Sequence, residues 1–589
     1  MRDEIKKLQL LTRRAFIIGL CQTALLMLIF LRYFYLQIID GIKYRTLSDK
    51  NRLRLSIIAA PRGIVTDRYN EDIITNSLDY KVVFESTEVH DIKKVLSTLK
   101  ELLPDKIDAT QEELTSRINK LQAGSSLTIA EVLSWEEIAK IELHTNVLPG
   151  VSVITSQKRV YNLKEQCAHI TGYIGSPTQQ ETKRLGISAS SDFYIGKSGI
   201  EKKLDEALRG VPGVKKTEVD AFGHYIRVIS STEPIQGETI ALSIDRGLQH
   251  SISELFGSKA GAAVVLKVET GEILSLYSNP SFDPNLFVGG ISMQAWQRLG
   301  KDPTTPLINK AISAQYPPGS TFKLVTGLAA LEHGIPEHLK VFCNGSYKVG
   351  NRIFHCMRKE GHGHVDLRLA IAQSCNVYFY VMAEKIGINN IAHAAKILGF
   401  GSKTKVELPY EKKGHIPEMG WKLLTFNKKW VMGDTINASI GQGFVLSTII
   451  QLAQMTARVA SGRAIQPTIL LGGNDAIMPR ALRVGQQHLE AVREGMFMAC
   501  NDHRGNMYRY CSGIPEFEMS GKTGTAQVIS LRKVLNKRFE DHGLFVGFAP
   551  FSKPKYAVAS IVEHGSWGAL SALPIAINIF SWLKKNDPT

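Results

Sequence analysis

The longest apolar stretch lies near the N-terminus, at residues 15–31 (AFIIGLCQTALLMLIFL), and carries no charge. If Arg32 reaches toward the lipid headgroups and residues 33–35 (Tyr-Phe-Tyr) extend the helix, it is long enough to cross a hydrocarbon core of about 30 Å. Aromatic residues at the end of such a segment are typical of the membrane interface. The pattern predicts a transmembrane anchor over residues 15–36, preceded by a tail of residues 1–14.

Basic residues flank this segment on both sides, so charge orients it only weakly. Residues 1–14 carry five cations and residues 43–54 carry five more. Long downstream domains cross a membrane largely regardless of charge, so we expect a cytoplasmic N-terminus and the rest of the chain on the far side. A cleaved signal peptide would end in a small-x-small site, which residues 36–40 do not offer. The anchor is therefore expected to be retained.

Residues 37–240 alternate short β-like runs with polar helical sequence. The β-like runs cover residues 54–59 and 81–85, and a helical stretch covers residues 91–123 with an interruption at Pro104. No run in this region has the spacing of a catalytic site. The pattern predicts a mixed α+β N-terminal domain, which ends at a shift in composition.

The second half, residues 241–589, has a simpler arrangement. Two β-rich runs are joined by a tight turn at Gly271, which predicts a hairpin. A long helical region follows, and three more β runs close the chain. Strands at both ends with helices between them predict an α/β unit whose termini meet in one antiparallel sheet. The five predicted strands cover residues 262–268, 273–278, 523–529, 544–548 and 556–563.

Composition narrows the class of protein. The chain has 589 residues, of which 44% are hydrophobic and 21% charged, values typical of a folded protein with more than one domain. A mean hydropathy of −0.05 excludes a polytopic membrane protein and permits one span. The net charge of +16 favours an anionic neighbour. The sequence contains no zinc-finger, helix-turn-helix or aromatic RNA-binding motif, so we expect a membrane or wall polymer rather than nucleic acid.

The stretch Pro-Pro-Gly-Ser-Thr-Phe-Lys at residues 317–323 places a serine where a helix begins. Ser320 and Lys323 are three residues apart and share one helix face. A serine hydroxyl is a weak nucleophile until a base takes its proton, and a desolvated lysine can be that base. The pattern S-x-x-K occurs six times in the chain, so it needs support from other motifs.

Two further motifs supply that support. Ser374-Cys375-Asn376 lies between two helical runs, and its alternation places the hydroxyl and the amide on the same side. Lys522-Thr523-Gly524-Thr525 opens a predicted strand. There a lysine and a threonine can hold a carboxylate, and the glycine leaves room for a substrate beside the strand edge.

The three motifs, in this order, resemble those of the penicillin-binding transpeptidases and serine β-lactamases. The likeness covers residues 245–589. Residues 62–68 (RGIVTDR), 196–201 (GKSGIE) and 208–210 (LRG) extend it to the class B penicillin-binding proteins. Within that family the chain is most similar to the elongation group, penicillin-binding protein 2, and the septal group is the close alternative.

The resemblance implies an α/β transpeptidase domain, an antiparallel sheet flanked by helices, on an elongated α+β pedestal of the dimerisation type. It implies an inner-membrane peptidoglycan D,D-transpeptidase whose catalytic domain is periplasmic and which β-lactams acylate. Ser320 would attack the penultimate D-Ala carbonyl of a stem peptide, and Lys323 would act as general base. Ser374 would relay a proton to the leaving amine, and Asn376 would hold the substrate amide. The residues implied to bind the terminal carboxylate side of the substrate are Lys522, Thr523, Gly524 and Thr525.

Neighbouring activities are less consistent with the sequence. No E-x-x-L-N string, which supplies the deacylating glutamate of class A β-lactamases, lies between Ser374 and Lys522. The glycosyltransferase signature of bifunctional synthases is also missing. Polymerisation of the glycan strands would therefore need a partner protein. The resemblance implies a RodA-like glycosyltransferase and an MreC-like activator. Two alternatives remain: a β-lactamase-like or sensor protein of the same fold, and a non-catalytic scaffold for wall synthesis.

Three cysteines and several histidines cluster between the first and second motifs. Cys343, Cys356, His362 and Cys375 provide three thiolates and an imidazole, a set suited to tetrahedral zinc. We expect a structural zinc ion at these residues and no organic cofactor. The alternative is a disulfide between the first two cysteines, with Cys375 buried. The sequence leaves open whether Cys500 and Cys511 pair.

Overall fold

The structure is a computed structural model of the whole chain. It describes residues 2–586 except for residues 41–52, 86–90, 105, 108, 120–125, 132, 186–192, 220–224, 474–478, 512–517 and 528–539.

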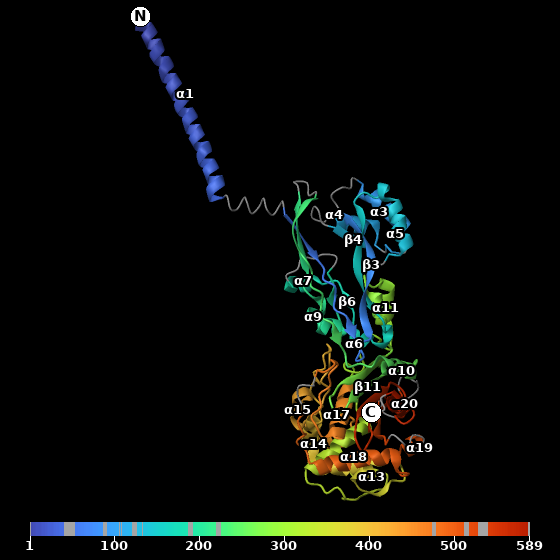
Figure 1. Ribbon diagram of the computed structural model, residues 1–589. Coiled ribbons are helices and arrows are strands. Elements are labelled where there is room, and N and C mark those ends of the chain that lie inside the picture. The colour runs from blue at the N-terminus through green and yellow to red at the C-terminus, as the bar shows by residue number, and fades with distance from the viewer. Residues whose placement is uncertain are drawn as a thin grey trace.

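A long N-terminal helix stands apart from the rest of the molecule (Figure 1). Helix α1 (Arg2–Phe34) continues into a π-helical turn, η1 (Tyr35–Ile39). Residues 12–39 are the one segment of the described chain that is long and apolar enough to cross a membrane, and none of its most apolar window is buried by protein. Because large side chains such as Leu28 are mostly exposed, lipid is the natural environment for this helix. The predicted anchor lies within it.

Two sheets form the two arms of the N-terminal pedestal (Figure 1). One arm is an antiparallel sheet of order β1-β8-β9, and the other has the order β10-β2-β3-β4 with β5 also paired to β3. Helices α3, α4 and α5 cover the second sheet and share a small apolar core with it. The elements are β1 (Leu53–Ile58), β2 (Val65–Thr66), β3 (Asp72–Glu85), α3 (Ile92–Leu102), α4 (Gln111–Asn119), β4 (Ser126–Ala130), α5 (Trp135–Leu143), β5 (Val151–Tyr161), β8 (Gly213–Val219), β9 (Tyr225–Thr232) and β10 (Ile240–Ala241).

Short elements join the two arms at their base. They are α6 (Ala168–Thr171), β6 (Ile174–Gly175), α7 (Gln179–Leu185), β7 (Ile195–Gly196), α8 (Gly199–Lys203) and α9 (Asp205–Arg209). The expected helical stretch 91–123 is two helices, α3 and α4, and the break falls near Pro104 as predicted.

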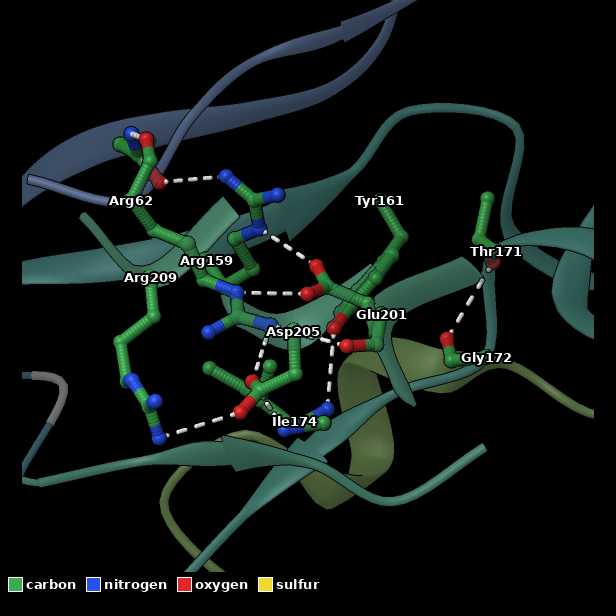
Figure 2. A network of polar contacts seen from close by, with 11 residues as sticks. Arg62, Arg159, Tyr161, Thr171, Gly172, Ile174, Glu201, Asp205 and Arg209 are labelled. Atoms are coloured by element: carbon green, nitrogen blue, oxygen red, sulfur yellow. Dashed lines mark hydrogen bonds and ion pairs between the residues drawn. The ribbon is translucent and has the colours of Figure 1, made fainter. Parts of the chain in front are cut away.

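A buried ionic network holds this base together (Figure 2). Glu201 is fully buried, and its carboxylate accepts from Arg62 Nε at 2.5 Å and from Arg159 Nε at 2.7 Å. Asp205 accepts from Arg62 Nη2 at 2.8 Å and lies 3.3 Å from Arg209 Nη1. Buried charges persist only where they are paired and hydrogen-bonded. The sequence segments 62–68 and 196–201, which are far apart in the chain, therefore meet in one contact.

The C-terminal half is built on one antiparallel sheet of order β12-β11-β19-β18-β17. Alternate residues of β11 enter different cores: Ala262 and Val264 pack with α12, α14 and α17, whereas Ala263 and Val265 pack with α10 and α20. A strand buried on both faces reads as a continuous apolar run. The strands are β11 (Gly261–Lys267), β12 (Ile273–Asn279), β17 (Ser520–Ala526), β18 (His542–Ala549) and β19 (Tyr556–Val562).

Helices cover both faces of this sheet, whereas α11 (Met293–Lys301) lies beside the pedestal (Figure 1). The other helices of this half are α10 (Arg246–Phe256), α12 (Lys323–Glu332), α13 (Leu367–Ala372), α14 (Asn376–Ile397), α15 (Met419–Phe426), α16 (Met432–Ser439), α17 (Ile449–Ser461), α18 (Gln486–Asn501), α19 (Tyr508–Cys511) and α20 (Ala572–Asn586). Two small antiparallel sheets, β13 (Val341–Cys343) with β16 (Gly363–Val365) and β14 (Ser346–Val349) with β15 (Arg352–His355), precede α13.

The predicted hairpin and the antiparallel sheet with helices on it are confirmed. Gly271, with φ of +81°, makes the tight turn between β11 and β12. The strand predicted from residue 523 begins earlier, at Ser520, and the last two residues of that prediction, 528 and 529, lie outside the described residues.

The pedestal and the C-terminal half share one apolar core at their junction. The largest apolar core contains pedestal residues such as Val65 and Ile73 together with Leu266 of the C-terminal sheet. Arg246 at the start of α10 also pairs with Glu71 of the pedestal at 2.9 Å.

Candidate active site

Ser320 lies in a single 3₁₀ turn, η5 (Gly319–Phe322), that runs directly into α12. Gly319 before it has a φ of +54°, and a Cβ there would lie 2.5 Å from the carbonyl oxygen of Thr525. Only glycine permits this approach of the turn to β17. Ser320 is half-buried, and its hydroxyl makes no hydrogen bond to any residue in the described part of the chain. The hydroxyl is therefore available to a substrate.

Lys323 begins α12 and is fully buried. Its Nζ donates to the carbonyl oxygen of Ser374 at 2.8 Å and to Asn376 Oδ1 at 2.6 Å, and lies 3.1 Å from Ser374 Oγ. Burial lowers the pKa of the Lys323 ammonium to about 8. A lysine held in this way is partly neutral near physiological pH and can accept a proton from a hydroxyl.

Ser374 occupies a left-handed backbone position at the end of α13, with a φ of +56°. The N–H of Cys375 donates to the carbonyl of Ala370 at 2.9 Å, and the N–H of Ser374 donates to that of Ile371 at 3.2 Å. These two bonds form the Schellman motif, in which the left-handed residue is usually glycine. A serine here bears backbone strain and places its hydroxyl beside Lys323. The backbone conformation favours glycine, whereas the site requires a hydroxyl.

Lys522 lies in β17, the edge strand of the sheet, and is fully buried. Its Nζ donates to the carbonyl oxygen of Thr523 at 3.3 Å. Burial, and then the charge of nearby Lys323, lower the pKa of Lys522 well below its ordinary value. A Cβ on Gly524 would lie 2.9 Å from Thr321 Cγ2, so the glycine lets the strand pass the nucleophile turn.

A glycine-rich loop after α16 borders the same turn. The N–H of Gly319 donates to the carbonyl of Gly441 at 3.0 Å, and Gln442 Nε2 donates to the carbonyl of Thr525 at 3.0 Å. Thr326 Oγ1 donates to the carbonyl of Ser439 at 2.7 Å. The contact of Gln442 with β17 depends on long-range packing, so the sequence alone does not predict it.

The three predicted motifs therefore meet. Lys323 contacts both polar residues of the second motif, and its charge acts on Lys522 of the third. Gly319 and Gly524 bring the turn that carries Ser320 against β17.

The predicted cysteine and histidine set also lies together. The ligand atoms of Cys343, Cys356, His362 and Cys375 are all within 4.8 Å of one another. His362 Nδ1 lies 3.6 Å from Cys343 Sγ and 3.4 Å from Cys356 Sγ. All three cysteines are free thiols in the structure. The N–H of Asn376 donates to Cys356 Sγ at 3.3 Å, which places this group directly behind the second motif.

Two family models match the chain. Residues 261–581 match the penicillin binding protein transpeptidase domain, and residues 57–242 match the penicillin-binding protein dimerisation domain. The chain is similar to the peptidoglycan D,D-transpeptidase MrdA of Acinetobacter baumannii, with 35% identity over 97% of this chain and 88% of the relative. It is 30% identical to MrdA of Escherichia coli K12 over 96% of this chain and 93% of that protein.

Solved structures agree with these matches. A complex between penicillin-binding protein PBP2 and MreC from Helicobacter pylori superposes with a TM-score of 0.80 at 31% identity, covering 90% of this chain and 99% of that one. PBP2 of Pseudomonas aeruginosa in complex with WCK 5153 has a TM-score of 0.69 at 30% identity, covering 90% and 97%.

The prediction of a zinc cofactor is wrong. The C-terminal half matches a penicillin-binding transpeptidase domain, and transpeptidases of this kind need no metal cofactor. A set of three thiols and an imidazole at close range is a weak indication of metal by itself. Here the contacts seen are hydrogen bonds, among them the bond from the Asn376 N–H to Cys356 Sγ.

Proposed function

Because the chain belongs to the class B penicillin-binding proteins, we propose that it is a peptidoglycan D,D-transpeptidase of the elongation type that works through an acyl-enzyme on Ser320. The observation that carries the assignment of roles is the buried Lys323 amine, which contacts Ser374 and Asn376 one turn away from the free Ser320 hydroxyl. The relatives are named peptidoglycan D,D-transpeptidases, which favours this function over a sensor or a scaffold.

In acylation, neutral Lys323 takes the proton of Ser320, and the serine Oγ attacks the penultimate D-Ala carbonyl of the stem peptide. The tetrahedral oxyanion is stabilised by the backbone N–H groups of Ser320 and Thr525, each worth about 2.7–4 kcal/mol in comparable sites. The C–N bond breaks, and Ser374 passes a proton to the departing D-Ala amine. Asn376 holds the substrate amide. An amine of a second stem peptide then attacks the ester, forms the cross-link and frees Ser320.

The terminal carboxylate of the donor is held by Lys522, Thr523 and Thr525. A bound carboxylate favours the charged form of Lys522, which burial otherwise disfavours. A cationic Lys522 in turn disfavours a second cation at Lys323, because the two charges interact. Substrate binding therefore keeps the general base neutral at the moment it is needed.

A labelled penicillin tests this assignment. We expect the adduct to map to the peptide that contains Ser320 and to disappear in Ser320→Ala. Ser402→Ala is the matched control, because Ser402 begins another S-x-x-K pattern and is exposed. Labelling of another residue would refute the assignment, and rapid turnover of the penicillin would indicate a β-lactamase-like protein instead.

The division of the chain and its orientation are part of the proposal. We place a cytoplasmic tail at residues 1–14, the anchor at 15–36, the pedestal at 37–240 and the catalytic domain at 241–589. Helix α1, the one described helix long and apolar enough to span a membrane, supports an anchor, and we place the catalytic domain on the periplasmic side.

We further propose that the pedestal binds an MreC-like activator and that a RodA-like glycosyltransferase supplies the glycan strand. A cavity of about 500 Å³ opens between the two arms and is lined in part by Ile58, Leu78 and Ile154. Leu78 is 74% exposed, as expected for a residue that a partner covers. Leu78→Glu should abolish copurification with the MreC-like protein and leave penicillin acylation unchanged. Unchanged copurification would contradict this surface.

A further inference from the structure

Two buried cysteines lie together behind the third motif, away from the Cys343 group. Cys500 is in the last turn of α18 and Cys511 ends α19, and their thiols are free in the structure and interact with each other. Their exposed fractions are 1% and 7%. Both pack in the apolar core under α10 and α20. Two thiols in contact need local adjustment rather than unfolding to form a covalent bond.

The backbone fixes this contact. The chain turns back on itself after α18, where the N–H of Met507 donates to the carbonyl of Ala499 at 3.0 Å and the N–H of Cys511 donates to that of Met507 at 3.1 Å. A Cβ on Gly505 would lie 2.3 Å from the carbonyl oxygen of Met498, so only glycine permits so tight a turn. The two cysteines are held on the same side of this corner.

The corner contacts two of the three motif segments. Asn501 Nδ2 donates to the carbonyl of Met519, the residue before β17, at 2.9 Å. The backbone of Gly521, next to Lys522, also interacts with the Cys500 thiol. On the other side, the N–H of Asn506 donates at 3.1 Å to the carbonyl of Ala372, two residues before Ser374.

We propose that Cys500 and Cys511 form a structural disulfide that fixes the α18–α19 corner behind β17 and the Ser374 turn. The proposal rests on the proposed periplasmic orientation, because disulfides persist in oxidising compartments. It goes beyond the catalytic assignment, since neither cysteine takes part in acylation.

The bond forms by thiol–disulfide exchange. The thiolate of one cysteine attacks a sulfur of a donor disulfide, such as that of a periplasmic dithiol oxidoreductase, and one donor thiolate leaves. The second cysteine then attacks the mixed disulfide and displaces the other donor thiolate. The protein loses two protons and two electrons, and the donor is reduced to its dithiol.

This exchange belongs to folding rather than to the finished protein. The hydrogen bond to Cys511 and burial raise the pKa of the Cys500 thiol well above its ordinary value. A buried thiol with so little thiolate exchanges slowly. We expect the bond to form before the corner closes and afterwards to resist reductants until the protein is denatured.

The test uses the full chain in its own membrane. Cells are quenched in acid, free thiols are alkylated under denaturing conditions, and the peptides are mapped by mass spectrometry without reduction. We expect a linked peptide pair containing Cys500 and Cys511, lighter than the two separate peptides by two hydrogen atoms. We also expect its loss in the Cys500→Ala/Cys511→Ala double variant. Cys167→Ala is the control for loss of a buried thiol, because Cys167 is buried in the pedestal.

A second measurement separates this proposal from the catalytic one. Intact cells without an outer membrane are treated with a labelled penicillin that does not cross the inner membrane, which reports both orientation and the Ser320 nucleophile. Alkylation of both cysteines in protein that the penicillin has acylated would overturn the disulfide and leave the proposed function intact. Alkylation of both in protein that remains unlabelled would overturn the disulfide together with the orientation.

A thermal measurement adds the structural consequence. The thermal midpoint of the purified wild type should fall by several degrees when reductant is present, because the constraint on the unfolded chain is lost. The midpoint of the double variant should not respond to reductant. An equal response in both proteins would contradict the proposal.

Discussion

The base of the pedestal and the catalytic centre both bury charges, but they treat them in opposite ways. In the pedestal, Glu201 and Asp205 pair with the arginines that surround them, as Figure 2 shows. In the catalytic centre, Lys323 and Lys522 are both fully buried, and no carboxylate contacts either amine among the residues that the structure describes.

The paired charges of the pedestal orient structural elements, whereas the unpaired lysines of the catalytic centre are reactive. A paired charge inside a protein is fixed in its charged form, and it orients the elements that supply it. A cation buried without a counter-ion is unstable as a cation, so its pKa falls and it becomes a base. The missing counter-ion at Lys522 is the carboxylate that the proposed substrate brings.

Removing the unpaired amine of the catalytic centre should have the largest effect. Lys323→Met keeps most of the side-chain volume but removes the proposed base, and we expect penicillin acylation to fall by about 10²–10⁴-fold. The second-order rate constant with a fluorescent penicillin measures it. Lys405→Met, at an exposed lysine of another S-x-x-K pattern, should retain the wild-type rate. A loss of less than tenfold in Lys323→Met would contradict the assignment of the base.

Breaking the paired network should act on stability and not on chemistry. Glu201→Gln leaves two arginines without their shared carboxylate, and a broken buried pair costs about 3–5 kcal/mol. The denaturant midpoint should fall accordingly, while the folded protein acylates at the wild-type rate. Glu254→Gln is the control, because that carboxylate is largely exposed. A slower acylation at unchanged stability would show that the network acts on the site.

The unpaired Lys323 of the catalytic centre should also make the acylation rate depend on pH. Lys323 loses its proton as the pH rises through about 8, so the acylation rate should rise about tenfold per pH unit below that value and level off above it. The folded pKa lies below the ordinary value of 10.5, so the unfolded chain binds more protons between these values and Lys323 makes stability rise with pH over that window. A stopped-flow rate profile measures the first effect, and a profile flat from pH 6 to 9 would argue against a lysine base.

The smallest expected effect is a difference in stability between two variants of the strained Ser374 turn. Ser374→Gly and Ser374→Ala both remove the hydroxyl, so both should acylate slowly. Glycine relieves the left-handed backbone, whereas alanine retains the strain, so the glycine variant should be more stable by about 1 kcal/mol. Denaturation of the two variants side by side measures the difference. Equal stabilities would mean that the turn relaxes around the alanine.

The sequence predicted the elements whose signal is local. The apolar run of α1, the hairpin around Gly271 and the serine of a turn that opens a helix each follow from a few neighbouring residues. The grouping of the three motifs came from the resemblance to a known family, because no local pattern places residues 320, 374 and 522 together.

What escaped the sequence depends on packing between distant segments. Arg159 pairs with Glu201 from near the end of β5, and nothing near it in the chain indicates that it is buried or paired. The hydrogen bond from Gln442 to β17 likewise has no signal in the neighbouring sequence. The zinc prediction failed for a related reason: residue types and spacing indicated proximity, which the structure has, but proximity of thiols does not by itself establish a metal requirement.

The ion pair between Arg62 and Glu201 joins residues 139 positions apart, and the core beneath it also includes strands from the far end of the chain. Because the chain is synthesised from its N-terminus, Arg62 is made long before its acidic partner. During that interval the early segments lack both their counter-charge and their apolar cover. We therefore expect a truncation that removes the C-terminal strands to destabilise the pedestal as well, because both contribute to the same core.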